Sequence, residues 1–323
     1  MTPQDLSQLL MVGVPDNNDL SHLRELSPGG VVLFGRNAGT PQEVRRLTRQ
    51  INDAVSQSGA PLPLIAIDQE GGRVQRLTDG FTTVPPMREL AQSGAGAVRL
   101  MAANVAAELR AIGINVNFAP VCDVPTHKED TIIGNRAFAT DAITAASLAA
   151  EYVRGAQPTV LCVAKHFPGH GNVGVDSHLA LPTDSSTRKE LGEQLLPFRA
   201  TIGAGIGGVM TGHIALPNVD QSGAPASLSR EIVTNILRRQ LNFDGLVFTD
   251  DLDMKALPQN NAGEIAVRAL QAGCDQLLFC HDIQKAFAAR DAIMQAIENR
   301  VLAASQIGAS LARIANMKAT FVA

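Results

Sequence analysis

Short apolar runs alternate with longer helix-like segments along almost the whole chain. Each run is bounded by glycine, proline or polar residues, which is typical of buried strands. The predicted strands are Leu9–Val14, Gly29–Phe34, Leu64–Asp68, Ile114–Val121, Val160–Ala164, Gly208–Thr211, Gly245–Thr249 and Gln276–Cys280.

The segments between these runs have the signals of helices. The clearest helix begins at Pro41, with Thr40 as its N-cap and with Val44, Leu47 and Ile51 at helical spacing. The other predicted helices are Ala97–Ile112, Ala142–Arg154, Ser186–Ile202, Arg230–Leu241, Glu264–Gln271 and the segment from Ile283 onward. Eight strand–helix units without a linker favour a single (β/α)₈ TIM barrel over an open doubly wound sheet. We therefore expect one catalytic domain over residues 1–323, without a C-terminal sandwich domain.

Composition narrows the possible partners. The chain of 323 residues is 45% hydrophobic and 18% charged, with a net charge of −4. The absence of a basic block argues against nucleic-acid binding, and the sequence shows neither a signal peptide nor an apolar stretch that could span a membrane.

The cysteines Cys122, Cys162, Cys274 and Cys280 form no CxxC pair. We expect them to be reduced, buried thiols of a cytoplasmic protein.

The stretch with the most candidate chemistry follows the strand Val160–Ala164. It reads KHFPGHGNVGVDSH and runs from Lys165 to His178. Lys165 and His166 come at the end of the strand, and a glycine-rich loop then leads to Asp176 and His178. Because a barrel brings the carboxyl ends of its strands to one face, we expect a site there.

Two pairs of residues are candidates for catalysis. Asp250 and Asp251 directly follow the strand Gly245–Thr249, and they either act in the site or cap the next helix. Asp176 and His178 are two positions apart, so that the carboxylate could hold the imidazole as a general acid/base; the alternative is two solvated loop residues.

Further polar residues suit the binding of a hydroxyl-rich or amide-bearing ligand. They are Asp68, Arg76, Arg136, Lys165 and His166. For each arginine the alternative is an ordinary salt bridge. The double glycine of IDQEGGRVQR would let the backbone approach a ligand.

Three functions remain open at this point: a glycosidase with Asp250 as nucleophile and His178 as acid/base, a metal-dependent hydrolase, and a barrel that only binds a sugar. The metal hypothesis is weakened because His166 and His170 are separated by Pro168 and Gly169, which forbid a helix. We expect structural roles for His170 and His213.

Several motifs in order carry a resemblance to a known family. IDQEGGRVQR, GNRAF, KHFPGHG followed by DSH, VMTGH and TDDLDM together resemble glycoside hydrolase family 3, above all its single-domain bacterial β-N-acetylglucosaminidases of peptidoglycan recycling. The resemblance implies a retaining exo-β-N-acetylglucosaminidase that releases N-acetylglucosamine from muropeptides through a covalent glycosyl-enzyme. We also expect a monomer, and, because no set of metal ligands with sound spacing is present, an enzyme that needs neither metal nor cofactor. The alternatives are a β-glucosidase-like or broad-specificity glycosidase or phosphorylase of the same family.

The resemblance also assigns roles to individual residues. Asp250 matches the nucleophile, His178 the acid/base and Asp176 the carboxylate that pairs with it. The positions that match the sugar-binding residues are Asp68, Arg76, Arg136, Lys165 and His166. Thr249 stands where serine is common in the family.

Overall fold

Eight parallel strands close into a barrel in the computed structural model, which describes residues 1–17, 19–126, 132–173, 180–257 and 261–322. Around the barrel the strands are β1 (Leu10–Gly13), β2 (Gly30–Leu33), β3 (Leu64–Ile67), β6 (Val116–Asn117), β7 (Leu161–Phe167), β8 (Gly208–Thr211), β9 (Leu246–Asp251) and β10 (Gln276–Phe279). The barrel closes where Leu10 of β1 lies opposite Leu277 of β10. The predicted (β/α)₈ barrel is therefore confirmed.

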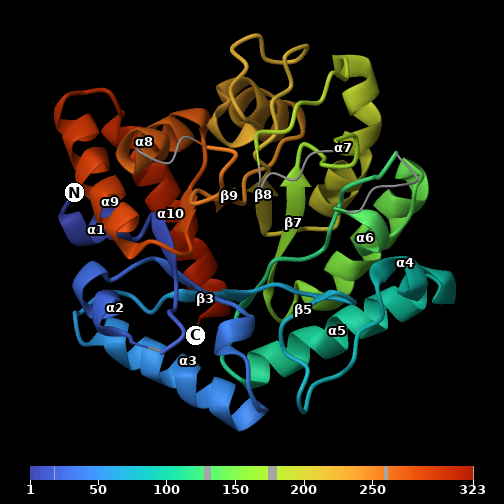
Figure 1. The fold of residues 1–323 in the computed structure, drawn as a ribbon, viewed down its shortest axis with the longest axis horizontal. Helices are drawn as coiled ribbons and strands as arrows, with labels where there is room; N and C mark the ends of the chain where they lie inside the picture. The colour runs from blue at the N-terminus through green and yellow to red at the C-terminus, as the bar shows by residue number, and fades with distance from the viewer. Residues whose placement is uncertain (18, 127–131, 174–179, 258–260, 323) are drawn as a thin grey trace.

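Helices surround the barrel (Figure 1). They are α1 (Pro3–Ser7), α2 (Ser21–Leu26), α3 (Pro41–Ser56), α4 (Met87–Leu90), α5 (Ala95–Ala111), α6 (Ala142–Ala156), α7 (Arg188–Gly203), a π-helix (Glu231–Gln240), α8 (Ala262–Ala272), α9 (Ile283–Glu298) and α10 (Ala304–Phe321). The predicted N-terminus of α3 is confirmed: the Thr40 hydroxyl accepts from the Glu43 amide, and the Glu43 carboxylate accepts from the Thr40 amide at 2.9 Å. None of the described helices is long and apolar enough to cross a membrane.

The interior of the barrel is packed with side chains. Phe118, just after β6, and Phe248 of β9 meet edge to face with ring centroids 5.9 Å apart. Both rings are buried. This packing fills the barrel below its carboxyl end, so a ligand has room only above it.

Two strands differ in length from the prediction. β7 continues to Phe167, because the backbone of Lys165 pairs with the segment after β6: its amide donates to Pro120 at 3.1 Å, and its carbonyl accepts from Cys122 at 2.7 Å. Lys165 and His166 thus lie inside the strand rather than after it. The predicted strand Ile114–Val121 is reduced to Val116–Asn117.

The long segment after β3 contains a small hairpin that the sequence analysis did not predict. β4 (Gln69–Gly71) pairs antiparallel with β5 (Val74–Gln75). Gly71 adopts φ 111°, and a Cβ atom on it would lie 2.7 Å from the Pro85 carbonyl oxygen. The double glycine therefore serves a tight turn against a neighbouring loop.

Candidate active site

A cavity of about 380 Å³ lies where the carboxyl ends of the barrel strands meet. Its polar lining comprises Asp68, Glu70, Arg76, Arg136, Lys165, His166, Asp250, Asp251, Asp253, Lys255 and His281. Phe118 and Met210 are among its apolar lining residues. The structure thus brings together every described residue that the sequence analysis selected for the site.

Lys165 lies at the centre of the charged lining. Its Nζ is 2.6 Å from Asp68 Oδ1 and 2.6 Å from Glu70 Oε1, and its side chain is only 3% exposed. Burial alone would lower the pKa of this amine, but the two carboxylates outweigh it and the pKa is raised. Lys165 is therefore a fixed cation that holds two acidic side chains in place.

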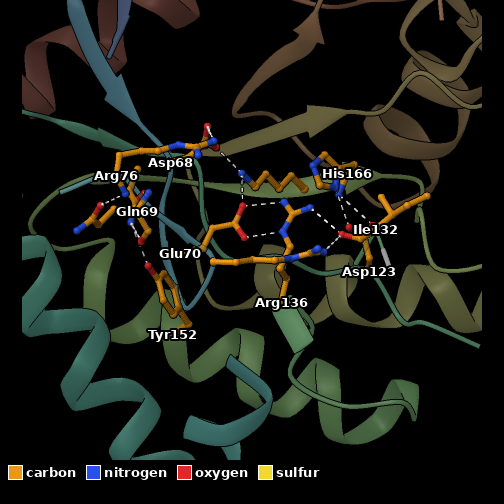
Figure 2. Close-up of polar contacts among 12 residues, drawn as sticks. Asp68, Gln69, Glu70, Arg76, Asp123, Ile132, Arg136, Tyr152 and His166 are labelled. Atoms are coloured by element: carbon orange, nitrogen blue, oxygen red, sulfur yellow. Dashed lines mark hydrogen bonds and ion pairs between the residues drawn. The ribbon is translucent and has the colours of Figure 1, made fainter. Parts of the chain in front are cut away.

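Glu70 connects Lys165 to Arg136, and Figure 2 shows the side chains of Glu70 and Arg136 pointing toward each other. The guanidinium donates from Nε to Glu70 Oε2 and from Nη2 to Glu70 Oε1, both at 2.8 Å. Burial would raise the pKa of Glu70, but the charges of Lys165 and Arg136 hold it well below its usual range. Arg136 thus makes the salt bridge that the sequence analysis kept as its alternative, while it still lines the cavity.

Glu70 was not among the residues predicted for the site. A signal for it exists, because Glu70 is two positions after Asp68, and residues two apart in an extended segment point to the same side. Arg76 completes this side of the cavity with Nη2 at 3.5 Å from Asp68 Oδ2. The loop that carries Arg76 is held by the side chain of Gln69, which accepts from the amides of Arg76 and Leu77 at 3.0 Å each.

His166 is oriented by a buried carboxylate that the sequence analysis also missed. Asp123 Oδ2 lies 2.7 Å from His166 Nδ1 (Figure 2). Asp123 Oδ1 accepts from the amides of His166 at 3.1 Å and His170 at 2.7 Å. Burial would raise the pKa of Asp123, but the neighbouring His166 outweighs it and the pKa is lowered. Because an ionised carboxylate only accepts hydrogen bonds, Nδ1 carries the proton and Nε2 is left for a ligand.

The acids at the end of β9 have opposite environments. Burial would raise the pKa of Asp250, but His166 and His213 outweigh it, so the pKa is lowered. Asp250 Oδ1 also accepts from the Asp251 amide at 2.8 Å. By contrast, burial and the charges of Asp253 and Asp250 raise the pKa of Asp251 to about 7. At neutral pH Asp250 is therefore ionised, whereas Asp251 is partly protonated.

Neither aspartate caps the next helix, so that alternative is wrong. α8 begins at Ala262, and its N-cap is Asn261, whose side chain accepts from the Glu264 amide. Asp251 instead joins β9 to β10: its Oδ1 accepts from the amide of Cys280 at 3.1 Å.

His170 and His213, the other described histidines named in the sequence analysis, are buried. His213 has Nδ1 2.7 Å from Ser227 Oγ and Nε2 3.0 Å from the Asp251 carbonyl, as expected of a structural residue. The ring of His170 packs edge to face on that of His166, with centroids 6.0 Å apart.

The predicted acid/base His178 and its partner Asp176 lie outside the described residues, so their roles stay predictions. The four cysteines are buried free thiols, as expected. Within the described part of the chain, no three His, Cys, Asp or Glu side chains are grouped so as to hold a metal ion.

Comparisons with known proteins agree with this geometry. The family model described as Glycosyl hydrolase family 3 N terminal domain matches residues 1–317. A beta-hexosaminidase of Nitrosomonas eutropha is 40% identical over 266 residues, which cover 79% of this chain and 74% of the relative.

Solved structures are similar over nearly the whole chain. A glycoside hydrolase family 3 beta-N-acetylglucosaminidase from Paenibacillus sp. str. FPU-7 superposes with a TM-score of 0.94 and 38% identity, over 99% of this chain and 62% of that one. A beta-N-acetylhexosaminidase from Beutenbergia cavernae DSM 12333 gives a TM-score of 0.91 and 31% identity, over 99% of both chains. The chain thus spans less than two thirds of the Paenibacillus protein and almost all of the Beutenbergia one.

Proposed function

Because this chain belongs to glycosyl hydrolase family 3, we propose that it is an exo-acting, retaining β-N-acetylglucosaminidase. The observation that carries the proposal is an ionised Asp250 beside a cavity whose inner wall is a network of buried charges. The names of the relatives, beta-hexosaminidase and beta-N-acetylglucosaminidase, support the same activity and the same sugar.

The charged wall suits the non-reducing end of a saccharide. Asp68 offers carboxylate oxygens and His166 offers Nε2 as acceptors, while Arg76 and Lys165 offer N–H donors, so that neighbouring hydroxyl groups of one sugar ring can be bound from both sides. Glu70 and Lys165 are 2% and 3% exposed, and they close the cavity on this side. A sugar ring held there has no room for a further residue beyond it, which favours exo cleavage. Arg136 contributes by fixing Glu70, and through it Lys165.

The proposed reaction has two steps. Asp250 attacks the anomeric carbon and forms a covalent glycosyl-enzyme, while His178, paired with Asp176, gives its proton to the leaving oxygen. His178 then takes a proton from water, whose oxygen attacks the anomeric carbon and releases both Asp250 and the sugar. Two inversions give net retention. The low pKa of Asp250 keeps the nucleophile ionised for the first step.

The finer details of the proposal rest on the resemblance of the sequence motifs. We propose muropeptides derived from peptidoglycan as the natural substrate, a cytoplasmic location, a monomeric state, and no nucleic-acid partner. The net charge of −4 is consistent with the last point.

A panel of aryl β-glycosides tests the function. We expect the N-acetylglucosaminide to be hydrolysed with a kcat/KM far above those of the glucoside and the N-acetylgalactosaminide. A preference for the glucoside would favour the β-glucosidase alternative. Lack of activity on the whole panel would contradict the proposal.

A further inference from the structure

A second cavity adjoins the active-site cavity on the side of β1, β2 and β10. It has a volume of about 470 Å³ and is lined by Pro15, Asp16, Asn17, Arg36 and His281. His281 lines both cavities, so the two meet at its side chain. The second cavity is thus an extension of the first, beyond the nucleophile and away from the buried charges.

Three side chains pack together at this junction: Phe34 lines the first cavity, Arg36 lines the second, and His281 lines both. The rings of Phe34, directly after β2, and His281, after β10, have centroids 5.6 Å apart at an angle of 36°. The guanidinium of Arg36 lies 4.5 Å from the centroid of the Phe34 ring. We call Phe34, Arg36 and His281 the junction cluster.

The barrel itself holds the junction cluster in place. Arg36 donates from Nε to the Val14 carbonyl at 2.7 Å and from Nη2 to the Cys280 carbonyl at 3.0 Å. These carbonyls follow β1 and β10, so one guanidinium ties three neighbouring strand ends together. A surface fixed in this way loses little conformational freedom when a ligand binds.

The orientation of the substrate decides what reaches the junction cluster. If the terminal sugar lies against Lys165 and its scissile bond lies at Asp250, the leaving group extends toward the open end of the cavity. His281, whose side chain is 58% exposed, lies at that end, with Nε2 3.4 Å from Asp251 Oδ2. Asp251 directly follows Asp250, so the junction cluster is next to the reacting centre.

We propose that the junction cluster is the subsite for the leaving group and that it takes a second pyranose ring; this inference rests on the proposed function. The C–H face of a pyranose is apolar and packs on aromatic rings such as those of Phe34 and His281. Arg36 supplies N–H donors for the oxygen atoms around that ring. The second cavity, about 470 Å³, adjoins the one that would hold the terminal sugar and shares His281 with it.

The test compares two substrates with the same terminal sugar. One is the disaccharide N,N′-diacetylchitobiose, whose leaving group is a pyranose, and the other is the β-fluoride of N-acetylglucosamine, whose leaving group has no ring. For Phe34→Leu, which keeps the apolar packing, and for His281→Ala, we expect kcat/KM for the disaccharide to fall about tenfold more than that for the fluoride. His281→Phe, which restores a ring, should recover most of this difference.

Phe287 provides a matched control. Its ring is stacked under Arg290 at 5.3 Å on α9, and it is not among the lining residues of either cavity. Phe287→Leu should leave the ratio of the two kcat/KM values unchanged. Equal losses on both substrates in the Phe34 and His281 variants, or no loss, would overturn the inference. A wild-type enzyme that cleaves the fluoride but not the disaccharide would overturn this inference alone, whereas one that cleaves neither would refute the proposed function.

Discussion

Replacing Glu70 by glutamine tests whether the buried charge network holds the site together. Glu70 is 2% exposed and makes three contacts with cations: one to Lys165 at 2.6 Å and two to Arg136 at 2.8 Å. A hydrogen bond to a charged group contributes about 1.5–3 kcal/mol, so three would contribute roughly 5–9 kcal/mol. Glutamine has no charge and keeps one acceptor oxygen, which at the position of Oε1 retains two of the three contacts while the amide nitrogen then faces the Nε donor of Arg136. We expect Glu70→Gln to lower the free energy of unfolding by about 3–5 kcal/mol, in the range for a broken buried ion pair.

The assay is chemical denaturation at pH 7, read as the free energy of unfolding. Glu231→Gln is the matched control, because Glu231 also pairs with an arginine, Arg188, but their side chains are 27% and 55% exposed. An exposed pair contributes at most about 1 kcal/mol. If Glu70→Gln costs no more than this control, the network does not stabilise the site and the reasoning is refuted.

The pH dependence separates the loss of charge from a loss of packing. The pKa of Glu70 is lowered in the folded protein, so its charge stabilises the fold fully above the ordinary glutamate pKa of about 4.3. This contribution is lost as the pH falls below that value toward the lower folded pKa. The difference between wild type and Glu70→Gln should therefore be constant from neutral pH down to about 4.3 and shrink at more acidic pH. A difference that does not shrink in acid would show that packing, not charge, is responsible.

Four further outcomes are expected. Asp250→Ala should abolish turnover without unfolding the protein, and a 2-fluoro sugar should label Asp250; a mass-spectrometric adduct on Asp251 would overturn the assignment. His178→Ala should cost far more with a disaccharide than with a nitrophenyl glycoside, which needs no proton on its leaving group, and equal losses would leave His178 only a role in shaping the site. Between about pH 4 and pH 7, the folded wild type keeps a proton on Asp251, whose pKa is raised to about 7, while the unfolded chain has lost it. The free energy of unfolding of wild type should therefore fall over this range relative to that of Asp251→Asn, as measured by denaturation. A difference between the two proteins that does not change with pH would contradict that pKa. Exhaustive chelation should leave activity unchanged, and a loss that zinc restores would revive the metal-dependent hydrolase.

The barrel was predictable because its strands are buried on both faces. Such strands read as continuous apolar runs, which is why GGVVLF and GLVFT are recognisable without a partner. The end of β7 was not predictable in the same way. Its last residues, Lys165–Phe167, include charged and polar side chains, and their strand geometry comes from backbone pairing with residues that are distant in the sequence.

The types of residue in the site were predictable, but their partners were not. A lysine, a histidine and an aspartate at strand ends predict a site on any barrel. Which carboxylate pairs with which basic side chain depends on distances between residues that follow different strands of the barrel. Glu70 and Asp123 act on Arg136 and His166 over separations of 66 and 43 residues, and no local pattern encodes such pairs.

The choice between Asp250 and Asp251 shows how the structure adds to the sequence. The two acids are adjacent, so their spacing cannot decide which one is the nucleophile. From the residues alone, Asp250 as nucleophile belonged to one of three open functions, and the resemblance then favoured it. In the fold, His166 and His213 lower the pKa of Asp250 and so favour its ionised form. Burial and the negative charge of Asp253 raise the pKa of Asp251 and so favour its protonated form. Adjacent carboxyl groups whose pKa values are driven apart are suited to different tasks. The ionised one supports the proposal that Asp250 attacks the sugar, and the partly protonated Asp251 is left to connect β9 with β10 and with His281 in the junction cluster.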